Sequence, residues 1–572
     1  MIIGIDLGTT NSLVGFWRDD HAELIPNALG KLLTPSVVSV EENGNILIGE
    51  AAKERLVTHP ADTVAAFKRY MGSARTTRLG QHAFRPEELS ALVLKSLKAD
   101  AEAHLHETVT KAVITVPAYF NDAQRKATRA AGELAGLKVE RLLNEPTAAA
   151  LAYGLHEAKP GQDAPDTRFV VLDLGGGTFD VSVLEFFEGV MEVRASAGDN
   201  FLGGEDFVDL LATTFLAEAA PNAWKKKTPP ALQSRIRNAA TRLLHQLSNA
   251  PSAQMTVAWE EERVSWTLDN EIFQKHAETL LKRLRVPIER ALRDSRFKLK
   301  ELDGLLLVGG ATRIAIVRQA MTRLFGRFPS THINPDEAIA LGAVTQAALK
   351  MRNAALEDLV LTDICPYSLG VDVAQTIAPG QFESGLFCPI IERNTLIPCS
   401  REHSFVTLSD YQQSVHFEIY QGESRRVANN IKLGEIEIDV PRKKAEEVTV
   451  NARFTYDIDG LLEVDVLVPE TGKRKNLVIQ GSNSHYDEAE LARRRAFLAT
   501  LKIHPRDQAE NRALLAKAER MYEECLGEAR DYIGQCISIF NAALESQDEH
   551  RIVRARKEME ERLNRIDLGV WE

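Results

Sequence analysis

The chain contains one short pattern twice, and this duplication constrains its fold more than any other feature. Residues 1–12 and residues 169–180 are each an apolar run that ends in Asp-Leu-Gly and continues into small residues and threonines. A second apolar run follows each of them, at residues 13–17 and 181–187. An apolar run, a glycine turn and a further apolar run predict a β-hairpin. The chain must therefore accommodate two similar hairpins that lie 167 residues apart in sequence.

The two turns have the composition of a phosphate-binding site. Glycine has no side chain, so its N–H group can approach an anion closely, and threonine adds a hydroxyl donor. The aspartates would repel a bare polyphosphate, so a cation must lie between them, and hard carboxylate ligands suit Mg²⁺. Two such hairpins could hold one nucleotide from opposite sides. The residues concerned are Asp6, Gly8, Thr9, Thr10, Asp173, Gly175, Gly176, Gly177, Thr178 and Asp180.

Either hairpin alone would carry little information, because an Asp-Gly or Gly-Gly turn is most often only a turn. The duplication favours the phosphate interpretation. Residues 305–313 favour it too, since they form a buried-strand pattern that again ends in paired glycines. The chain has neither a P-loop nor a GxGxxG motif, so the common nucleotide-binding signatures do not apply.

Length and composition limit the class of protein. With 572 residues the chain can form three or four domains, and its net charge of −12 argues against nucleic acid as a partner. The sequence begins directly with the first predicted strand, which leaves no room for a signal peptide, and we find no apolar run that could span a membrane. The five cysteines form no Cys-x-x-Cys motif, so we expect reduced thiols in a cytoplasmic protein rather than metal ligands.

The first part of the chain has the pattern of an α/β domain. Residues 1–355 alternate strand-like and helix-like stretches. Residues 111–117 predict a short buried strand, and residues 122–134 predict a helix capped by Asn121 or Asp122.

Two charged residues near helix ends have an unremarkable interpretation when taken alone. Glu145 lies between a strand and the start of an Ala-rich helix, where the helix dipole favours a carboxylate. Lys68 lies near a predicted helix end, where a solvated lysine is the simplest interpretation.

A set of motifs, taken together, resembles the seventy-kilodalton heat-shock chaperone family of the DnaK type, and within it the short HscC-type members. The resemblance covers nearly the whole chain and implies an actin-like ATPase of two lobes, a β-sandwich that binds peptides, and a short helical lid. The motifs are residues 6–12, 116–125, 144–154, 173–180, 203–207 and 334–338.

The resemblance implies a role for each residue around the phosphates. Lys68 would position the attacking water and stabilise charge on the γ-phosphate. Asp6, Glu145 and Asp173 would hold Mg²⁺, mostly through its waters, and Asp180 would orient water or a monovalent cation such as K⁺. Phosphoryl transfer depends on such positioning and electrostatics. Further implied contacts to ATP or ADP are Gly8, Thr9, Thr10, Asn11, Gly175, Gly176, Gly177, Thr178, Gly203, Gly204 and Asp336.

The adenosine side departs from the family pattern. Gly309, Gly310 and Arg313 match the family's turn that contacts the base. In the family, a facing helix supplies a glutamate, a lysine and a serine to the nucleotide, and of these three this chain keeps only the serine, Ser248. Thr241 and Leu244 stand at the other two positions, unless the alignment has slipped. Each lost polar contact is worth about 1 kcal/mol, so we expect weaker nucleotide binding and faster release.

The resemblance also implies partners and a route of communication between domains. Pro117 and Arg125 would relay the nucleotide state, and the apolar linker residues Leu359, Val360 and Leu361 would dock on the ATPase. Arg141, Asn144 and Asp363 match positions that contact J-domain co-chaperones. Residues 72–86 and 256–269 are both compact where the family is longer. The second segment matches the docking place of the usual nucleotide-exchange factor, so that partner is in doubt.

Residues 364–482 change to short alternating runs separated by turns, which predict a β-sandwich. An extended client would pair with the backbone of a loop and place an apolar side chain in a pocket. Plain core packing is the alternative for each pocket residue alone. We predict a long loop at residues 375–388. The matching pocket positions are Val371, Phe405, Val415 and Phe417, with Ala374 and Leu408 as an arch over the peptide.

From Asp487 the pattern is helical, with a capping box formed with Glu490 and a second helix starting at Pro505. Heptads are not sustained, so a lid or small bundle is expected rather than a coiled coil. The predicted division is therefore an ATPase domain at 1–355, a linker at 356–363, a sandwich at 364–482 and a lid at 483–572.

The sequence leaves two alternatives to an ATP-driven chaperone for unfolded polypeptides. An actin-like small-molecule kinase would share the phosphate hairpins but would leave the sandwich and lid without a purpose. A nucleotide-gated binding module with little turnover would suit the reduced adenosine site, but Lys68, Glu145, Asp173 and Thr178 are all present.

Overall fold

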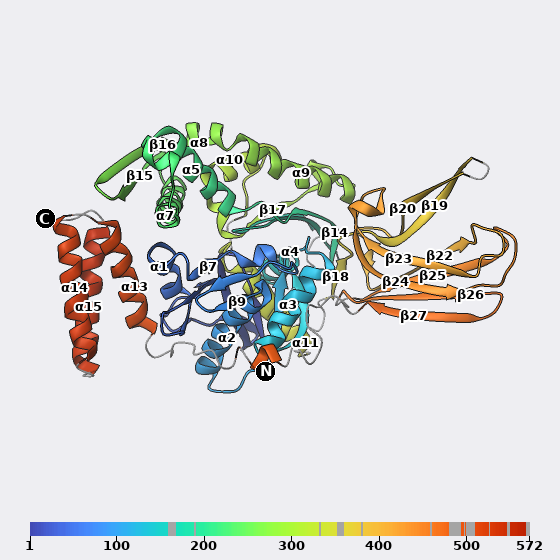
Figure 1. Ribbon diagram of the computed structural model, residues 1–572, viewed down its shortest axis with the longest axis horizontal. Coiled ribbons are helices and arrows are strands. Elements are labelled where there is room, and N and C mark those ends of the chain that lie inside the picture. The colour runs from blue at the N-terminus through green and yellow to red at the C-terminus, as the bar shows by residue number, and fades with distance from the viewer. Residues whose placement is uncertain are drawn as a thin grey trace.

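The computed structural model describes residues 1–157, 167–187, 190–330, 333–351, 360–378, 381–457, 460–479, 493–496, 498, 509–525, 527–545 and 549–567. A two-lobed α/β body lies in the middle, with a β-sandwich at one end of the long axis and a helical bundle at the other (Figure 1). The predicted fold class is therefore confirmed. No helix in these ranges is long and apolar enough to cross a membrane.

The first lobe is built on a mixed sheet of strand order β11-β10-β1-β2-β3, with β4 paired to β2. The first predicted hairpin is β1 and β2, and β1 also runs parallel to β10. Asp6 thus ends a central strand. The elements are β1 (Ile2–Asp6), β2 (Asn11–Arg18), β3 (His21–Leu24), β4 (Thr34–Pro35), β5 (Val37–Val40), β6 (Ile46–Ile48), α1 (Glu50–Thr58), β7 (Thr63–Ala65), η1 (Phe67–Tyr70), β8 (Thr77–Leu79), β9 (His82–Phe84), α2 (Pro86–Leu105), β10 (Lys111–Val116), α3 (Asp122–Leu134) and β11 (Lys138–Asn144).

The second lobe repeats this plan on a sheet of order β17-β12-β13-β14-β18-β21. The second predicted hairpin is β12 and β13, and its register places Asp173 opposite Asp180. The elements are β12 (Thr167–Leu174), β13 (Phe179–Phe187), β14 (Val190–Asp199), α5 (Gly204–Glu218), α6 (Asn222–Lys226), α7 (Pro230–Leu247), β15 (Ser252–Trp259), β16 (Glu262–Asp269), α8 (Asn270–His276), α9 (Glu278–Ser295), η2 (Leu299–Glu301), β17 (Gly304–Val308), η3 (Gly310–Arg313) and α10 (Ala315–Phe325).

Two helices join the lobes, α4 (Glu145–Glu157) and α11 (Ala338–Lys350). They pack on each other so closely that a Cβ on Gly342 would lie 1.7 Å from the carbonyl oxygen of Ala148. One apolar cluster takes Val113 from the first sheet, Val171 from the second and Ala148 from α4. This shared core places the glycine turns of the two hairpins face to face.

The linker region continues the second sheet. Strand β18 (Val360–Ile364) pairs in parallel with β14 and antiparallel with β21 (Leu396–Ile397), so the sheet of the second lobe runs on into the sandwich. The sandwich stacks sheets of order β20-β19-β23-β24 and β22-β25-β26-β27. Its other elements are β19 (Leu369–Ala378), β20 (Gln381–Ile391), β22 (Cys399–Val406), β23 (Ser414–Gln421), η5 (Val427–Asn429), β24 (Ile431–Asp439), β25 (Thr449–Tyr456), β26 (Leu462–Val468) and β27 (Lys473–Ile479).

The prediction of a long loop at residues 375–388 was wrong. Strand β19 extends to Ala378, and β20 begins at Gln381 and pairs with it. Register shifts interrupt this pairing between Val373 and Gln375 and again between Thr376 and Ala378. A bulge breaks the strict alternation of a strand, so these residues do not show a strand pattern in the sequence.

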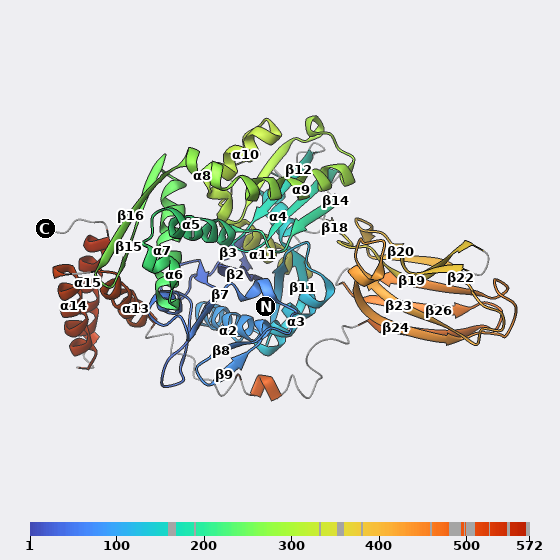
Figure 2. The same cartoon turned by 45° about the horizontal axis from the view of Figure 1, so that its top comes forward.

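The C-terminal part forms a bundle of three helices, α13 (Ala509–Glu524), α14 (Glu528–Glu545) and α15 (Glu549–Asp567), as the lack of sustained heptads predicts. Its core includes Met521, Phe540 and Leu563. The expected helix starts at Asp487, Glu490 and Pro505 lie outside the described residues. Figures 1 and 2 agree that the bundle lies against the two-lobed body, far from the sandwich.

Candidate functional site

Four carboxylates and one lysine meet between the two hairpins. Asp6 ends β1, Asp173 lies near the end of β12 and Asp180 lies near the start of β13. Glu145 is the first residue of α4, and Lys68 lies in the short helix η1. Each side chain is at most 7% exposed, so the solvated interpretation of Lys68 was wrong.

Only part of this charge is compensated within the chain. Lys68 Nζ donates to Glu145 Oε1 over 2.6 Å, and Thr115 Oγ1 donates to Asp6 Oδ1 over 2.9 Å. Among the described residues, none donates a hydrogen bond to the buried Oδ2 atoms of Asp173 and Asp180. Buried carboxylate oxygens need partners, so these atoms indicate a ligand that the chain itself does not supply.

The electrostatics of the cluster lead to the same conclusion. Burial and the neighbouring Glu145 raise the pKa of Asp6 to about 7, and the same two causes raise the pKa of Asp180 to about 7. Burial, Glu145 and Asp180 raise the pKa of Asp173 well above its ordinary value. A hard divalent cation would remove this mutual repulsion, and oxygen donors of this kind fit Mg²⁺.

The two glycine turns approach each other as closely as the backbone allows. A Cβ on Gly176 would lie 1.8 Å from Thr10 Oγ1, so the second turn touches the first. A Cβ on Gly203 would lie 2.5 Å from the backbone of Gly176. At the start of α5, Gly204 N donates to Gly175 O over 2.9 Å. A helix N-terminus and two glycine turns thus converge, as anion sites require.

Two serine side chains hold the first turn, one from β2 and one that follows β4. Ser36 Oγ donates to Gly8 O over 2.8 Å, and Gly8 N donates to Ser12 Oγ over 3.2 Å. A Cβ on Gly8 would lie 2.0 Å from Asn11 O, so only glycine fits there. In the second turn, Gly175 N donates to Thr178 O over 3.1 Å.

An ion pair across the cleft escaped the sequence analysis. Arg69 of the first lobe pairs with Asp206 of α5 in the second, with 2.9 Å between Nη2 and Oδ2. The Arg69 side chain packs against Gly177, and a Cβ on this glycine would lie 2.7 Å from Arg69 Cγ. Its place next to Lys68 was the only signal in the sequence.

The adenosine-side residues form a second group. Gly309 has φ +83°, and Leu174 O and Asp173 Oδ1 lie within 3 Å of its would-be Cβ. Arg313 Nη2 donates to Asp336 Oδ2 over 2.8 Å, and Gly310 lies beside the same carboxylate. On the facing helix α7, Leu244 is buried in the core of the second lobe. The hydroxyl of Thr241 donates to Arg237 O, and the hydroxyl of Ser248, at the end of the helix, donates to Leu244 O.

Comparison with known proteins identifies this arrangement. A family model described as Hsp70 protein matches residues 2–79 and 73–567. The chain belongs to the Hsp70 family. It is 40% identical over 502 residues to the chaperone protein DnaK of Thermotoga neapolitana, covering 85% of this chain and 81% of that protein. The DnaK proteins of Thermotoga maritima and Thermosipho africanus are each 40% identical, over 84% of this chain and 80% of their own length.

Family membership decides between the functions that the sequence left open. Hsp70 proteins are ATP-dependent chaperones and ATPases that use Mg²⁺, so this chain is an ATP-driven chaperone rather than a small-molecule kinase. The resemblance to the DnaK type is confirmed, while the closer resemblance to HscC-type members stays a prediction.

In the Hsp70 domain interface, the structure brings together two predicted relay residues, Arg125 and Asp363, and the predicted co-chaperone residue Asn144. Arg125 donates to Asn144 Oδ1, and Asn144 Nδ2 donates to Asp363 Oδ2 over 2.7 Å. Arg141 Nη1 donates to Gln346 Oε1 over 2.8 Å, and Pro117 O accepts from Phe120 N at the end of β10. Of the apolar linker positions, Val360 and Leu361 lie in β18 and Leu359 lies outside the described residues.

Tyr119 connects the phosphate site to the sandwich, which the sequence did not reveal. Its backbone N–H donates to Asp180 Oδ1 over 3.0 Å, and its carbonyl accepts from the Tyr367 hydroxyl over 2.9 Å. The two tyrosine rings lie 4.4 Å apart. Tyr367 of the sandwich thus bonds the carbonyl of Tyr119, the residue whose N–H holds the Asp180 carboxylate.

Most of the predicted peptide-binding residues lie on two strands of one sandwich sheet and on the facing β22, and Leu408 follows the end of β22. Val371 of β19 and Phe417 of β23 are buried in the sandwich core. Phe405 and Val415 are partly buried, and the rings of Phe405 and Phe417 lie 5.2 Å apart. Of the two arch positions, Ala374 is partly buried and Leu408 is 40% exposed.

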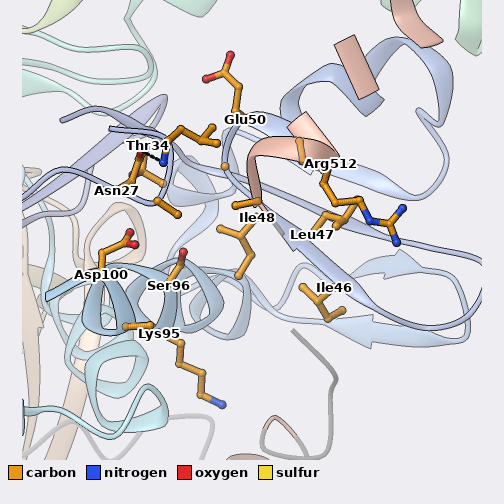
Figure 3. A pocket seen from close by; sticks show the side chains of 16 residues that line it. Asn27, Thr34, Ile46, Leu47, Ile48, Glu50, Lys95, Ser96, Asp100 and Arg512 are labelled. Carbon is orange, nitrogen blue, oxygen red and sulfur yellow. Dashed lines mark hydrogen bonds between the residues drawn. The ribbon is translucent and has the colours of Figure 1, made fainter. Parts of the chain in front are cut away.

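A well-formed cavity lies away from all these residues. It measures about 330 Å³ and lies between α2, β6, α1 and the first turn of α13. Figure 3 shows Lys95, Ser96 and Asp100 of α2 on one side and Arg512 of α13 on another. The cavity marks the contact between the helical bundle and the first lobe.

Proposed function

We propose that Lys68, Glu145, Asp173, Thr178 and Asp180 carry out ATP hydrolysis in this Hsp70, and that the sandwich traps extended apolar client segments. The buried Lys68–Glu145 pair, set among carboxylates with unpartnered oxygens, is the observation that carries this proposal. Buried ions without partners are costly, so a purely structural core would not contain such a group of carboxylates.

The chain's own residues would supply positioning. Thr9, Thr10 and Thr178 offer hydroxyl donors to phosphate oxygens, and the glycine turns offer backbone N–H groups. Lys68 is fixed by Glu145 with its ammonium inside the cleft, where it can stabilise charge that develops on the γ-phosphate. Asp180 is fixed by the Tyr119 N–H and keeps one free oxygen to orient water.

Asp6, Glu145 and Asp173 would hold Mg²⁺, largely through water. The metal would neutralise part of the negative charge of the phosphates. K⁺ beside Asp180 belongs to the proposal as well. The donor set fits such ions because every group is an oxygen anion and the pKa values of Asp6 and Asp180 are raised in their absence.

We infer that peptide binding and hydrolysis are coupled through the linker region. Strand β18 extends the second lobe's sheet and joins β21 next to the sandwich, so nucleotide-driven movement of that lobe reaches the sandwich directly. The helical bundle lies far from the sandwich in both views, which suits a state in which clients can enter (Figures 1 and 2). ATP and the client peptide would then both act on one equilibrium between a docked and an undocked state of the two domains.

The proposed partners follow from the same surfaces. Unfolded or extended polypeptides are the clients, and a J-domain protein would contact the region of Arg141, Asn144 and Asp363. A conventional exchange factor remains doubtful in this proposal, and a cytoplasmic location agrees with five cysteines that form no disulfide. We also propose that the chain is an HscC-type member.

The test is steady-state ATP hydrolysis with and without an apolar heptapeptide, for wild type and Leu359→Asp. We expect the peptide to stimulate the wild type and not the variant, since a charged linker cannot dock on an apolar surface. A rate of ATP hydrolysis that the peptide does not change in either protein would contradict coupling through the linker.

A further inference from the structure

Helix α13 contacts both lobes of the ATPase at once. We propose that α13 acts as an interlobe clamp, formed by Arg512, Arg520, Glu523 and Glu524, that slows nucleotide release until the helical bundle detaches. The proposal rests on the nucleotide site proposed above and assigns to the bundle a second role besides covering clients.

On the first lobe, the interlobe clamp pairs with two acidic residues. Arg512 Nη1 lies 3.2 Å from Glu41 Oε1, next to β5. Arg520, which is 8% exposed, pairs with Glu54 of α1. Helix α1 packs along α13 over much of its length, so this contact is broad.

On the second lobe, the interlobe clamp pairs with basic and amide side chains of α7. Arg235 Nη1 donates to Glu523 O over 2.7 Å, and its Nη2 lies 3.0 Å from Glu523 Oε2. Asn238 Nδ2 donates to Glu524 Oε1 over 2.9 Å, and Arg242 Nη1 lies 3.2 Å from Glu524 Oε2. Strand β15 contacts the same helix.

The two halves are linked within one turn of α13. Arg520 Nη1 donates to Glu524 Oε2 over 2.7 Å, a spacing of four residues that suits an ion pair on a helix. A continuous series of charges therefore runs from Glu54 through Arg520 and Glu524 to Arg242. It joins the two lobes without passing through the shared core.

This junction lies where the lobes must separate. Helices α1 and α7 touch each other directly, and α7 leads into Ser248 on the proposed adenosine side. A nucleotide enclosed between the lobes can leave only if these walls move apart. Because α13 is bound to both walls, opening requires loss of at least one set of its ion pairs.

The contact has the properties of a reversible one. A pocket of about 330 Å³, shown in Figure 3, remains between α13 and the first lobe. A second pocket, of about 340 Å³, remains between the second lobe and the bundle. Both pockets are open to solvent, so water reaches the edges of this contact. Arg242 and Glu523 are 43% and 36% exposed, so salt screens part of the attraction.

The test uses full-length protein loaded with Mg²⁺ and N-methylanthraniloyl ATP, chased with unlabelled ATP in a stopped-flow instrument within the first seconds. The clamp variant is Glu523→Lys with Glu524→Lys, which places lysines against Arg235 and Arg242. The matched control is Glu528→Lys with Asp531→Lys, an equal charge change on exposed positions of α14. The rescue adds Arg235→Glu and Arg242→Glu to the clamp variant.

We expect release at least fivefold faster in the clamp variant, within twofold of wild type in the control, and restored to within about threefold by the rescue. We also expect wild-type release to accelerate with NaCl between 50 and 500 mM more than release from the clamp variant. Equal release rates in wild type and clamp variant, or equal salt responses, would overturn the interlobe clamp. A wild type that does not bind labelled ATP would overturn the nucleotide site itself.

Discussion

Asn144 Nδ2 donates to Asp363 Oδ2 over 2.7 Å, which ties the end of β11, the edge strand of the first lobe's sheet, to the linker strand β18. Both residues are buried, and Arg125 donates to the same amide from α3. A buried hydrogen bond of this kind is made only while β18 is docked, so it reports the state of the domain interface.

Asp363→Ala should uncouple peptide binding from hydrolysis. It leaves Asn144 Nδ2 without its acceptor in a buried place, a loss of about 1–3 kcal/mol for the docked state. We expect the ratio of peptide-stimulated to basal hydrolysis to fall several-fold toward one. Asp439→Ala, which removes an exposed ion pair with Lys473, is the control and should keep the wild-type ratio. A wild-type ratio in Asp363→Ala would contradict the role of this contact.

Tyr367→Phe should weaken the same coupling by a smaller amount. The variant keeps the ring that packs on Tyr119 but loses the hydroxyl that donates to the Tyr119 carbonyl. The loss of one hydrogen bond corresponds to about 1 kcal/mol, or roughly fivefold in the docking equilibrium. Peptide-stimulated hydrolysis measured over a peptide titration would detect it. An unaltered titration curve would show that the hydroxyl does not contribute.

Gly176→Ala should disrupt the phosphate turn, whereas Gly175→Ala should be far milder for the empty protein. An added Cβ would lie 1.8 Å from Thr10 Oγ1 at position 176 but no closer than 3.9 Å to any atom at position 175. We expect the first variant to lose most of its affinity for ADP and about 1–3 kcal/mol of unfolding free energy from overpacking. Urea unfolding of both variants without nucleotide makes the comparison, and equal losses would contradict it.

Lys68→Met should lower the single-turnover rate of ATP hydrolysis by at least about 100-fold, with ATP affinity changed much less. Removing a preorganised charge from a transition state has a cost of this size. The control is Lys53→Met on α1, where the side chain is 53% exposed. Hydrolysis within about threefold of wild type would remove Lys68 from the mechanism.

The stability of the metal-free protein should fall as pH rises, and the stabilisation by Mg²⁺ with ADP should increase. Folding raises the pKa of Asp6 and Asp180 from 3.8 to about 7 in metal-free protein, so the folded state binds more protons between these values. Stability from these groups therefore falls as pH rises from about 4 to about 7. Mg²⁺ with ADP binds the ionised carboxylates, so its increase in Tm should be larger at pH 8 than at pH 6. Differential scanning calorimetry measures both, and a larger increase at pH 6 would contradict the prediction.

Local pattern predicted the two hairpins and their residues well. Residues 111–117 and 122–134 were expected as a strand and a helix, and the structure has β10 at Lys111–Val116 and α3 at Asp122–Leu134, with Asn121 accepting from Gln124 N. These features depend on neighbours within a few residues, which periodicity and capping report directly. Strands β19 and β20 were missed because bulges remove that periodicity.

Long-range polar contacts had no signal in the sequence. Arg69 meets Asp206, Tyr119 meets Tyr367, and Glu524 meets Arg242, each through a side chain whose partner is distant in the chain. No spacing rule relates such pairs, because a hydrogen bond depends on where whole lobes and domains lie.

The sequence by itself determined the two Asp-Leu-Gly hairpins, the oxygen-rich chemistry between them, and the order of α/β body, sandwich and bundle. Glycine turns, apolar alternation and capping residues act locally, so they can be recognised without a fold. Only the tertiary structure decided that Lys68 is buried on Glu145, that Asp363 docks on Asn144, and that α13 joins both lobes. Those relationships follow from the burial of surfaces contributed by separate elements, and burial is a property of the assembled chain.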